Sequence, residues 1–259
     1  MVDLGGALSD AVARSVEKAL LAEVLREPVP RHVAIIMDGN RRFAQSQGLD
    51  PWRGHEMGRD TLENVLDWCL ETGVRYLTVY AFSTENFRRN LLEVQLLMKL
   101  FEDNFRKMAE DERVHQHKIR VRAIGQIDLL PPSVREAIAY AEKRTADYDQ
   151  YFFQVALAYG GRQEILHAIQ RIAHEVEAGK LRPDEIDEAT VSQHLFTSDL
   201  PDPDLILRTS GEERISNFLL WQVAYAELLF VDVLWPRFKK IDFLRALRTH
   251  QQRQRRYGE

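Results

Sequence analysis

A hydrophobic run that ends in an acid, a glycine and an amide has the clearest chemistry in the sequence. The run is Val33-Ala-Ile-Ile-Met-Asp-Gly-Asn-Arg-Arg, and it predicts a buried strand followed by a loop and a helix. Gly39 allows close backbone approach to a ligand, Arg42 can bind an anion with its planar guanidinium, and Asp38 can hold Mg²⁺. An Asp-Gly turn that caps a helix has the same residues, so this motif alone leaves both interpretations open.

Two more polar clusters follow hydrophobic runs further along the chain. One, Tyr80-Ala-Phe-Ser-Thr-Glu-Asn-Phe-Arg-Arg, offers four side chains that can bind or orient a polar group: Ser83, Glu85, Asn86 and Arg89. In the other, Arg208 ends a run, and Arg214 and Ser216 stand in a loop that contains a glycine. Because the carboxyl ends of parallel strands meet at one edge of a sheet, the three clusters together predict an anion-binding site there.

Glu227 stands alone among hydrophobic residues between Leu219 and Val231. A buried carboxylate is costly unless it has a cationic partner or a metal. The residue therefore predicts either a buried salt bridge or a metal contact, and its surroundings in the sequence do not decide between them.

The intervening residues predict the elements that position these clusters. Hydrophobic runs typical of buried strands occur at 33–37, 76–82, 152–158, 205–207 and 228–233, and the alternating run at 119–124 suits an edge strand. Helical periodicity covers 54–72, 91–111, 131–146, 161–178 and 242–256. This alternation predicts a single-domain α/β protein with a mostly parallel central sheet of about six strands, flanked by helices.

The predicted helix at 91–111 is more hydrophobic than one packing face requires. It is either fully buried, part of a subunit interface, or the wall of a cavity for a long apolar ligand. Together with the arginines and the isolated acids, the third interpretation favours an amphiphile with a polyanionic head. A prenyl diphosphate fits that description, and so does another kind of phosphorylated lipid.

The first 29 residues predict an N-terminal extension. Hydrophobic side chains recur there at every fourth position, as in an amphipathic helix: Leu8, Val12, Val16, Leu20 and Val24. Such a helix can pack on the rest of the chain, or it can contact a membrane surface or a partner. We therefore divide the chain into a helical extension at 1–29 and one domain at 30–259.

The composition argues against several classes of function. With 35 Lys and Arg against 40 Asp and Glu, the net charge is -5, whereas nucleic-acid-binding proteins usually carry a basic excess. The single Cys69 cannot form an intrachain disulfide or a cysteine-based zinc site. Charged residues interrupt the most hydrophobic long stretch, 215–235, so we expect no membrane-spanning helix. Without a recognisable signal peptide, these features indicate a cytoplasmic protein that does not bind nucleic acid.

The sequence resembles the cis-prenyltransferases, a family that includes undecaprenyl and dehydrodolichyl diphosphate synthases. The resemblance runs from about residue 30 to residue 258 and rests on motifs in the family's order: His32-Val-Ala-Ile-Ile-Met-Asp-Gly-Asn-Arg-Arg, Gly54-His, Tyr80-Ala-Phe-Ser-Thr-Glu-Asn, Ala158-Tyr-Gly-Gly-Arg, Asp202-Pro-Asp-Leu-Ile-Leu-Arg-Thr-Ser-Gly-Glu and Arg214-Ile-Ser-Asn-Phe-Leu-Leu-Trp-Gln. It implies a homodimer with a parallel sheet and a hydrophobic tunnel, in which 30–259 is the catalytic domain.

The resemblance also implies the reaction. A Mg²⁺-dependent transferase would add isopentenyl diphosphate repeatedly to an allylic primer, farnesyl or geranylgeranyl diphosphate, and form cis double bonds. The product would be a long-chain Z-polyprenyl diphosphate, the precursor of a glycosyl carrier lipid. Its release would bring the enzyme into loose association with a membrane.

Individual residues match the family's functional positions. Asp38 matches the Mg²⁺ ligand, and Glu227 matches a second Mg²⁺ contact that comes from the neighbouring subunit in some members. Positions around the allylic diphosphate are matched by Gly39, Asn40, Arg42, His55 and Arg89, and those that hold isopentenyl diphosphate by Arg208, Arg214 and Ser216. Arg256-Tyr-Gly258 resembles the C-terminal motif that reaches the partner's active site. In the catalytic set beside Asp38 we interpret Asn40, Ser83 and Asn86 as groups that orient the substrates.

The chain departs from bacterial members of the family near the first motif. Those members often have Gly and Trp where this chain has Arg41 and Phe43, and Trp where it has Phe87; we keep all three as substrate-binding candidates. Pro51 replaces a diphosphate-binding arginine, and whether Arg53 takes over that contact is left open.

Alternatives stay open within the resemblance. The same fold could use a different acceptor, such as a prenylglyceryl phosphate, or the chain could be a noncatalytic subunit of a heteromeric prenyltransferase, although its retained acids and arginines argue against that. A Mg²⁺-dependent phosphohydrolase would need an acid where the chain has Asn40. Product length is also open; Tyr151 is predicted near the cavity floor, where its bulk would favour a shorter chain.

Overall fold

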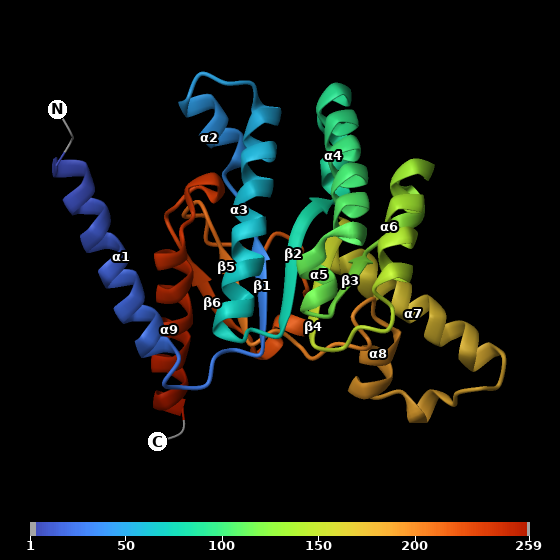
Figure 1. Cartoon of the computed structure of the whole chain (residues 1–259). Coiled ribbons are helices and arrows are strands. Elements are labelled where there is room, and N and C mark those ends of the chain that lie inside the picture. The colour runs from blue at the N-terminus through green and yellow to red at the C-terminus, as the bar shows by residue number, and fades with distance from the viewer. Residues whose placement is uncertain (1–3, 258–259) are drawn as a thin grey trace.

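The computed structural model describes the backbone of residues 4–257 and the side chains of residues 14–253. Within these residues, six strands form one sheet in the order β3-β4-β2-β1-β5-β6, and all neighbouring pairs are parallel (Figure 1). The strands are β1 His32–Ile36, β2 Tyr76–Ser83, β3 Ile119–Ile124, β4 Tyr151–Tyr159, β5 Leu205–Arg208 and β6 Glu227–Phe230. The predicted α/β class and six-stranded sheet are confirmed, and the sheet is parallel throughout.

Burial explains why these segments form strands. Every residue of β1 is buried, because helices cover both faces of a parallel sheet and leave no solvent-facing position. At the edge of the sheet, β3 instead alternates buried Ile119 and Val121 with partly exposed Arg120 and Arg122. The edge position predicted for this strand is confirmed.

Helices pack on both faces of the sheet (Figure 1). On one face lie α3 Pro51–Thr72, α4 Leu91–Glu110, α6 Pro132–Arg144 and α9 Lys240–Tyr257, which share a large hydrophobic core with Val33, Val79 and Val155. On the other face, a segment around Phe218 packs against Ala34, and α7 Gly161–Glu177 joins it through buried Glu164. The first of these faces carries α3 and α4, and the candidate site described below lies between these helices and the sheet.

Periodicity does not predict the shortest helices, because a helix of seven or fewer residues shows no full repeat of its hydrophobic pattern. These are α2 Asn40–Ser46, α5 Glu112–Gln116 and α8 Glu188–His194, with the 3-10 turns η1 Thr84–Arg88, η2 Ile127–Leu129, η3 Pro183–Glu185, η4 Gln222–Tyr225 and η5 Trp235–Arg237. α3 begins at Pro51, before its predicted start, since proline suits the first turn of a helix.

The N-terminal helix α1 Leu4–Val24 lies beside α9 (Figure 1). Leu20 and Val24 are buried, and the Gln251 side-chain amide of α9 donates to the carbonyl of Val24 over 2.9 Å. The described part of α1 is therefore packed on the C-terminal helix. No helix in the described part of the chain is long and apolar enough to cross a membrane.

Candidate active site

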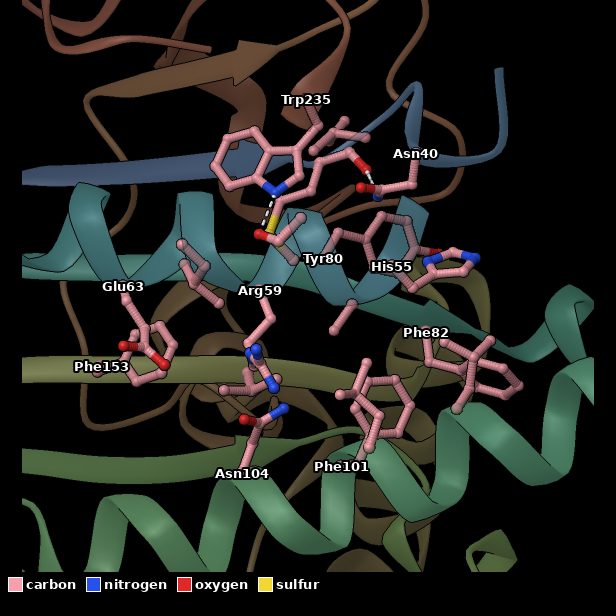
Figure 2. A pocket seen from close by; sticks show the side chains of 18 of the residues that line it. Asn40, His55, Arg59, Glu63, Tyr80, Phe82, Phe101, Asn104, Phe153 and Trp235 are labelled. Carbon is pink, nitrogen blue, oxygen red and sulfur yellow. Dashed lines mark hydrogen bonds between the residues drawn. The ribbon is translucent and has the colours of Figure 1, made fainter. Parts of the chain in front are cut away.

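A cavity of about 690 Å³ lies between the sheet and helices α3 and α4. It begins beside Asp38 and Arg208 and follows α3 from His55 to Leu70, a length of roughly 22 Å at 1.5 Å per residue. Figure 2 shows Phe82, Phe101 and Phe153 among its lining side chains. The apolar wall also includes Leu62, Leu66, Leu97, Leu100, Phe105 and Val155. The extra hydrophobic residues of α4 thus form a cavity wall, one of the three roles open to them from sequence.

Asp38 and Arg208 meet where the order of strands reverses. The chain leaves β1 toward β2 and leaves its neighbour β5 toward β6, on the opposite side of the sheet. Parallel α/β sheets bind ligands in the crevice at such a switch point. Asp38 follows β1, Arg208 ends β5, and an Arg208 guanidinium nitrogen donates to Asp38 Oδ2 over 2.7 Å. Burial alone would raise the pKa of Asp38, but Arg208, together with a hydrogen bond from Ser210 and the charge of Arg42, holds this pKa below its usual value.

Arg42 approaches the same carboxylate from α2. One of its guanidinium nitrogens donates to Ser210 Oγ over 2.5 Å and lies 3.7 Å from Asp38 Oδ1. A second nitrogen lies 3.4 Å from Glu212. The side chain is about half exposed, so an anion can reach it. The structure therefore brings Asp38, Arg42 and Arg208 together, as the sequence predicts.

The loop after β5 is held in a strained conformation. Ser210, Ser216, Asn217 and Leu219 all have positive φ angles, which cost non-glycine residues roughly 1–3 kcal/mol each and are typical of functional sites. Arg208 fixes the loop by donating to Ser216 Oγ over 2.8 Å. The same guanidinium nitrogen also donates to the Arg214 carbonyl. Arg208 thus sets the place of Ser216 and of the Arg214 backbone.

Glu93 contacts two arginines and a histidine at the mouth of the cavity. Its Oε1 lies 3.2 Å from an Arg89 guanidinium nitrogen, 3.5 Å from His55 Nε2 and 3.8 Å from Arg41 Nε. Burial, with the positive charge of Arg89, lowers the pKa of His55 to about 4, so His55 is neutral at pH 7. The arrangement offers a diphosphate two arginines and one neutral imidazole.

Close packing of α3 sets the position of Asn40. A Cβ on Gly54 would lie 2.1 Å from the Asn40 carbonyl oxygen, and one on Gly58 would lie 2.2 Å from Asn40 Oδ1. Gly39 itself has a φ of 104° and adjoins Leu234. The Asn40 amide donates to the Met37 carbonyl over 3.1 Å, so this residue also holds the loop that carries Asp38.

Ser83 and Asn86 shape the turn that leads to Arg89. The Ser83 N–H donates to Asn86 Oδ1 over 3.1 Å, and the two residues form a capping box around η1. Phe87 packs edge-to-face on Phe82. Ser83 and Asn86 line the cavity, whereas Phe87 contributes to the packing behind it.

Several predicted residues lie elsewhere. Phe43 is buried in α2 beneath the Arg237 guanidinium and is not part of the cavity lining, so the structure gives it a packing role. Arg53 stacks over Trp52 and pairs with Glu56. Tyr151, predicted near the cavity floor, does not line this cavity but lies next to its far end: it encloses a small adjoining pocket with Ile119 and Phe153, which do line the cavity. Gly258 and the side chain of Arg256 lie outside the described residues.

Within one chain, the two predicted Mg²⁺ ligands lie at opposite ends of the sheet. Glu227 begins β6 and is in register with Leu205, which pairs with Val33. Asp38 lies five residues beyond Val33 along β1, roughly 16 Å away at the rise of a strand. Within one chain the two carboxylates are therefore too far apart to hold the same ion, and Glu227 lies 3.4 Å from His250 Nδ1 and 3.6 Å from an Arg253 guanidinium nitrogen. A contact between Glu227 and the Mg²⁺ of a neighbouring subunit stays a prediction.

Sequence reasoning missed the charged residues along the far part of the cavity. They come from α3, from α4 and from the segment after α4: Arg59, Glu63, Asp67, Lys107, Asp111 and Arg113. Their only signal in the sequence is the spacing of four between Arg59, Glu63 and Asp67, which puts them on one side of a helix. A stripe of charged residues with this spacing is usually the solvent-exposed face of a helix, so it does not indicate a cavity wall.

Comparison with known proteins decides the family. Residues 36–258 match the family model described as "Putative undecaprenyl diphosphate synthase". The chain belongs to the cis-prenyltransferase family. It is 56% identical over 247 residues to a tritrans,polycis-undecaprenyl-diphosphate synthase (geranylgeranyl-diphosphate specific) of Methanopyrus kandleri, with 95% of this chain and 91% of that protein covered. A relative of the same name from Methanocaldococcus jannaschii is 51% identical over 253 residues, covering 97% and 90%.

Solved structures agree with this cis-prenyltransferase fold. Lavandulyl diphosphate synthase from Lavandula x intermedia, in complex with dimethylallyl diphosphate, superposes with a TM-score of 0.81 at 39% identity, over 86% of this chain and 95% of that one. A probable undecaprenyl diphosphate synthase from Campylobacter jejuni gives a TM-score of 0.72 at 33% identity, over 90% and 100%. The protein is accordingly an enzyme that transfers prenyl groups.

Proposed function

We propose that this cis-prenyltransferase condenses isopentenyl diphosphate sequentially with geranylgeranyl diphosphate to make a long-chain Z-polyprenyl diphosphate, the precursor of a glycosyl carrier lipid. One observation supports it most: a single cavity joins the cationic site around Asp38 and Arg208 to a long apolar wall. The names of the archaeal relatives favour geranylgeranyl over farnesyl diphosphate as the primer.

The two substrates would use different arginines. Arg89, with Arg41 and His55 beside it, would bind the diphosphate of the allylic primer, whose apolar tail would lie along α3 and α4. Arg208, Arg214 and Ser216 would bind isopentenyl diphosphate. Holding both headgroups at the switch point brings C4 of the acceptor near C1 of the primer, and such positioning lowers the barrier to bond formation.

The residues at the switch point fit a Mg²⁺ ion that is held partly by substrate. Asp38 is a partly exposed carboxylate in the cavity lining, whereas arginines and amides surround it. In the described part of the chain no three His, Cys, Asp or Glu side chains are placed to hold a metal. One carboxylate suits Mg²⁺, which usually completes its shell with phosphate oxygens and water. When bound, the ion would neutralise charge on the departing diphosphate.

The chain's own cations would contribute to the same step. As the C1–O bond of the primer breaks, negative charge grows on its diphosphate, and Arg89 and Arg42 are placed to stabilise it. C4 of isopentenyl diphosphate would attack C1, and the C2 proton would pass to an oxygen of the substrate diphosphate as the new double bond forms. Tyr80 also lines the cavity; burial raises the pKa of its partly buried hydroxyl, which donates to the Tyr159 carbonyl over 3.2 Å.

We further propose a homodimer and loose membrane association. The edge strand β6 has the fully exposed Tyr225 just before it and Glu227 as its first residue, so a second copy on this edge could bring Glu227 toward the partner's Asp38. Exposed Leu91 and Leu92 at the start of α4 would support contact with a lipid surface near the cavity mouth.

The experiment is a chain-elongation assay. Purified protein is incubated with Mg²⁺, labelled isopentenyl diphosphate and, in parallel, geranyl, farnesyl and geranylgeranyl diphosphate, and the dephosphorylated products are resolved by length. We expect a polyprenol ladder that is strongest with geranylgeranyl diphosphate and absent when a chelator removes Mg²⁺. No incorporation by folded protein would overturn the proposal and direct attention to another acceptor or a missing subunit.

A further inference from the structure

Asn217 joins the loop after β5 to the start of α7. Its side-chain Oδ1 accepts a hydrogen bond from the Arg162 N–H over 2.9 Å, and its backbone carbonyl accepts one from the Gly161 N–H over 2.6 Å. The residue before α7 is Gly160, which has no side chain to cap the helix, and the first N–H groups of a helix have no partner within it. Asn217 therefore supplies, from another segment, the cap that α7 lacks.

The amide nitrogen of the same side chain reaches the turn after β2. Asn217 Nδ2 donates to Glu85 Oε1 over 3.2 Å and to Gln163 Oε1 over 3.1 Å. An ionised carboxylate only accepts hydrogen bonds and a backbone N–H only donates them, so Glu85 and Arg162 together fix which way the amide points. Both amide hydrogens have acceptors inside the protein, so the side chain is suited to hold segments together and not to donate to a ligand.

The loop at 209–217 depends on such contacts because it contains no helix or strand. Ser216 has a φ of 48° and Asn217 a φ of 63°, in the left-handed region that asparagine adopts more readily than most residues. Arg208 holds Ser216 from β5 through the 2.8 Å hydrogen bond to its hydroxyl. Asn217 holds the next residue of the loop to α7, so the end of the loop is fixed from two sides.

The turn η1 depends less on this amide. The hydrogen bonds between Ser83 and Asn86 close the turn from within. Glu85, which accepts from Asn217, is exposed, so water can replace the lost donor. Loss of the Asn217 side chain should therefore loosen the loop after β5 and leave η1, which leads to Arg89, in place.

We propose that Asn217 is a positioning residue for isopentenyl diphosphate, because its amide orders the loop that carries Arg214 and Ser216 before this substrate binds. The inference rests on the proposed function, which assigns isopentenyl diphosphate to those two residues. A loop that is ordered in advance binds its ligand more tightly, since binding then need not order it. Loss of the amide should weaken the binding of isopentenyl diphosphate and leave that of the allylic primer unchanged.

Asn217→Gly tests the amide alone, because glycine keeps the positive φ without strain while the three side-chain hydrogen bonds are lost. Its matched control is Lys118→Gly, at a second non-glycine position with a positive φ, 52°. The Lys118 side chain lies over Tyr148 and does not line the cavity. Both full-length variants are measured by steady-state kinetics with each substrate varied in turn, by thermal unfolding and by amide hydrogen exchange.

We expect KM for isopentenyl diphosphate to rise about tenfold in Asn217→Gly, the scale of losing one or two hydrogen bonds. KM for geranylgeranyl diphosphate and kcat should stay within about twofold of wild type, because the loop is ordered again once isopentenyl diphosphate saturates it. Amide exchange should quicken at 209–217 and at Arg162. Lys118→Gly should change neither KM nor this exchange. Equal rises in both KM values, or unchanged exchange in the loop, would overturn the positioning role.

A second pair of variants keeps the test decisive if Asn217→Gly fails to fold. In Asn217→Asp the side chain still accepts from the Arg162 N–H, but it has no hydrogen to donate, and Glu85, unlike Gln163, has none to offer in return. KM for isopentenyl diphosphate should rise here as well.

The double variant Asn217→Asp/Glu85→Gln restores both the donor–acceptor pair and the net charge. It should return KM for isopentenyl diphosphate to within about threefold of wild type, since the two positions are coupled. A double variant no better than Asn217→Asp would contradict the proposal. A wild-type protein that adds no isopentenyl diphosphate, although its loop exchanges faster in Asn217→Gly, would instead overturn the proposed function and leave the ordering of the loop by Asn217 standing.

Discussion

Arg208 donates a hydrogen bond to Asp38 over 2.7 Å, and this contact spans the two strands where the sheet reverses its order. Arg208 is 4% exposed, yet among the described residues none accepts a hydrogen bond from its Nε. A buried N–H donor usually has a hydrogen-bond partner, so the free Nε–H of Arg208 suggests that a ligand supplies the missing acceptor. A polyanion would do so beside the partly exposed carboxylate of Asp38. The hydrogen bond from Arg208 also favours the ionised form of Asp38. Only the ionised carboxylate attracts both a metal cation and an arginine.

Replacing Asp38 with Asn removes the negative charge of the side chain but keeps its size and shape. The amide oxygen can still accept from Arg208, so the fold should persist, but the charge that suits Mg²⁺ is lost. We expect kcat to fall by about 100-fold or more, the scale of losing one electrostatic contact in a transition state. Steady-state kinetics with a thermal unfolding curve checks this, and Asp60→Asn, at an exposed site, is the control. Near-normal turnover would remove Asp38 from the mechanism.

Glu93 should act as a positioning residue for the primer site. It holds Arg89 and faces His55 and Arg41 through one oxygen, but it does not line the cavity. In Glu93→Gln the charged contacts are weakened, so KM for the allylic diphosphate should rise about tenfold, the effect of losing some 1.4 kcal/mol. KM for isopentenyl diphosphate should change little. Glu102→Gln on the same helix is the control, and equal changes in both KM values would contradict the assignment.

Much of the fold follows from the sequence because buried parallel strands are continuous hydrophobic runs. The strand from Ile119 to Ile124 is found at its exact bounds, since its alternating arginines reveal the edge of the sheet. The motif predicts a helix after Asp38 and Gly39, but the bounds of α2 cannot be predicted because seven residues show no period. Pairing order is equally hidden, and only the register shows that Glu227 and Asp38 lie at opposite ends of the sheet.

The candidate site is predictable where one strand end carries several polar residues. Asp38, Arg42, Arg208 and Ser216 come together because their segments end at the same edge. Phe43 follows Arg42 directly, but successive side chains of a helix point about 100° apart. Phe43 is accordingly buried and is not among the residues that line the cavity. The position of Glu63 and Asp67 along the cavity cannot be predicted from the sequence, since a stripe of charges on a helix looks the same whether it borders a cavity or only solvent.

The stability of the protein should decline as the pH falls from about 6.5 to about 4. Burial lowers the pKa of His32 to about 4, and burial with Arg89 does the same for His55. In the unfolded chain both imidazoles titrate near 6.5, so between these values the unfolded state binds protons that the folded state excludes. Each histidine should therefore reduce the free energy of unfolding by about 1.4 kcal/mol per pH unit in that window.

Denaturant titrations at pH 7 and pH 5 measure this slope. His55→Gln should reduce it, because the glutamine takes up no proton, whereas His174→Gln, at an exposed position, should leave it unchanged. A slope identical in wild type and His55→Gln would show that this imidazole is not held neutral in the folded protein.

Gly58→Ala tests whether close packing of α3 positions the catalytic loop. The added Cβ would lie 2.2 Å from Asn40 Oδ1 and 2.9 Å from Trp235 Cδ1, and Trp235 is fixed by its indole N–H, which donates to the Gly58 carbonyl over 2.7 Å. Neither neighbour can yield without moving the loop or the helix, so we expect a loss of about 1–3 kcal/mol in stability, as in overpacked cores.

The displaced loop carries Asp38, so the same Gly58→Ala variant should also lose activity with both substrates, most clearly in kcat. Asn64→Ala, on the exposed side of α3, is the matched control and should change neither quantity. Unfolding midpoints and steady-state kinetics on the two variants separate the effects. If Gly58→Ala is destabilised but fully active, the packing supports the fold alone, because the loop then keeps Asp38 in place despite the strain.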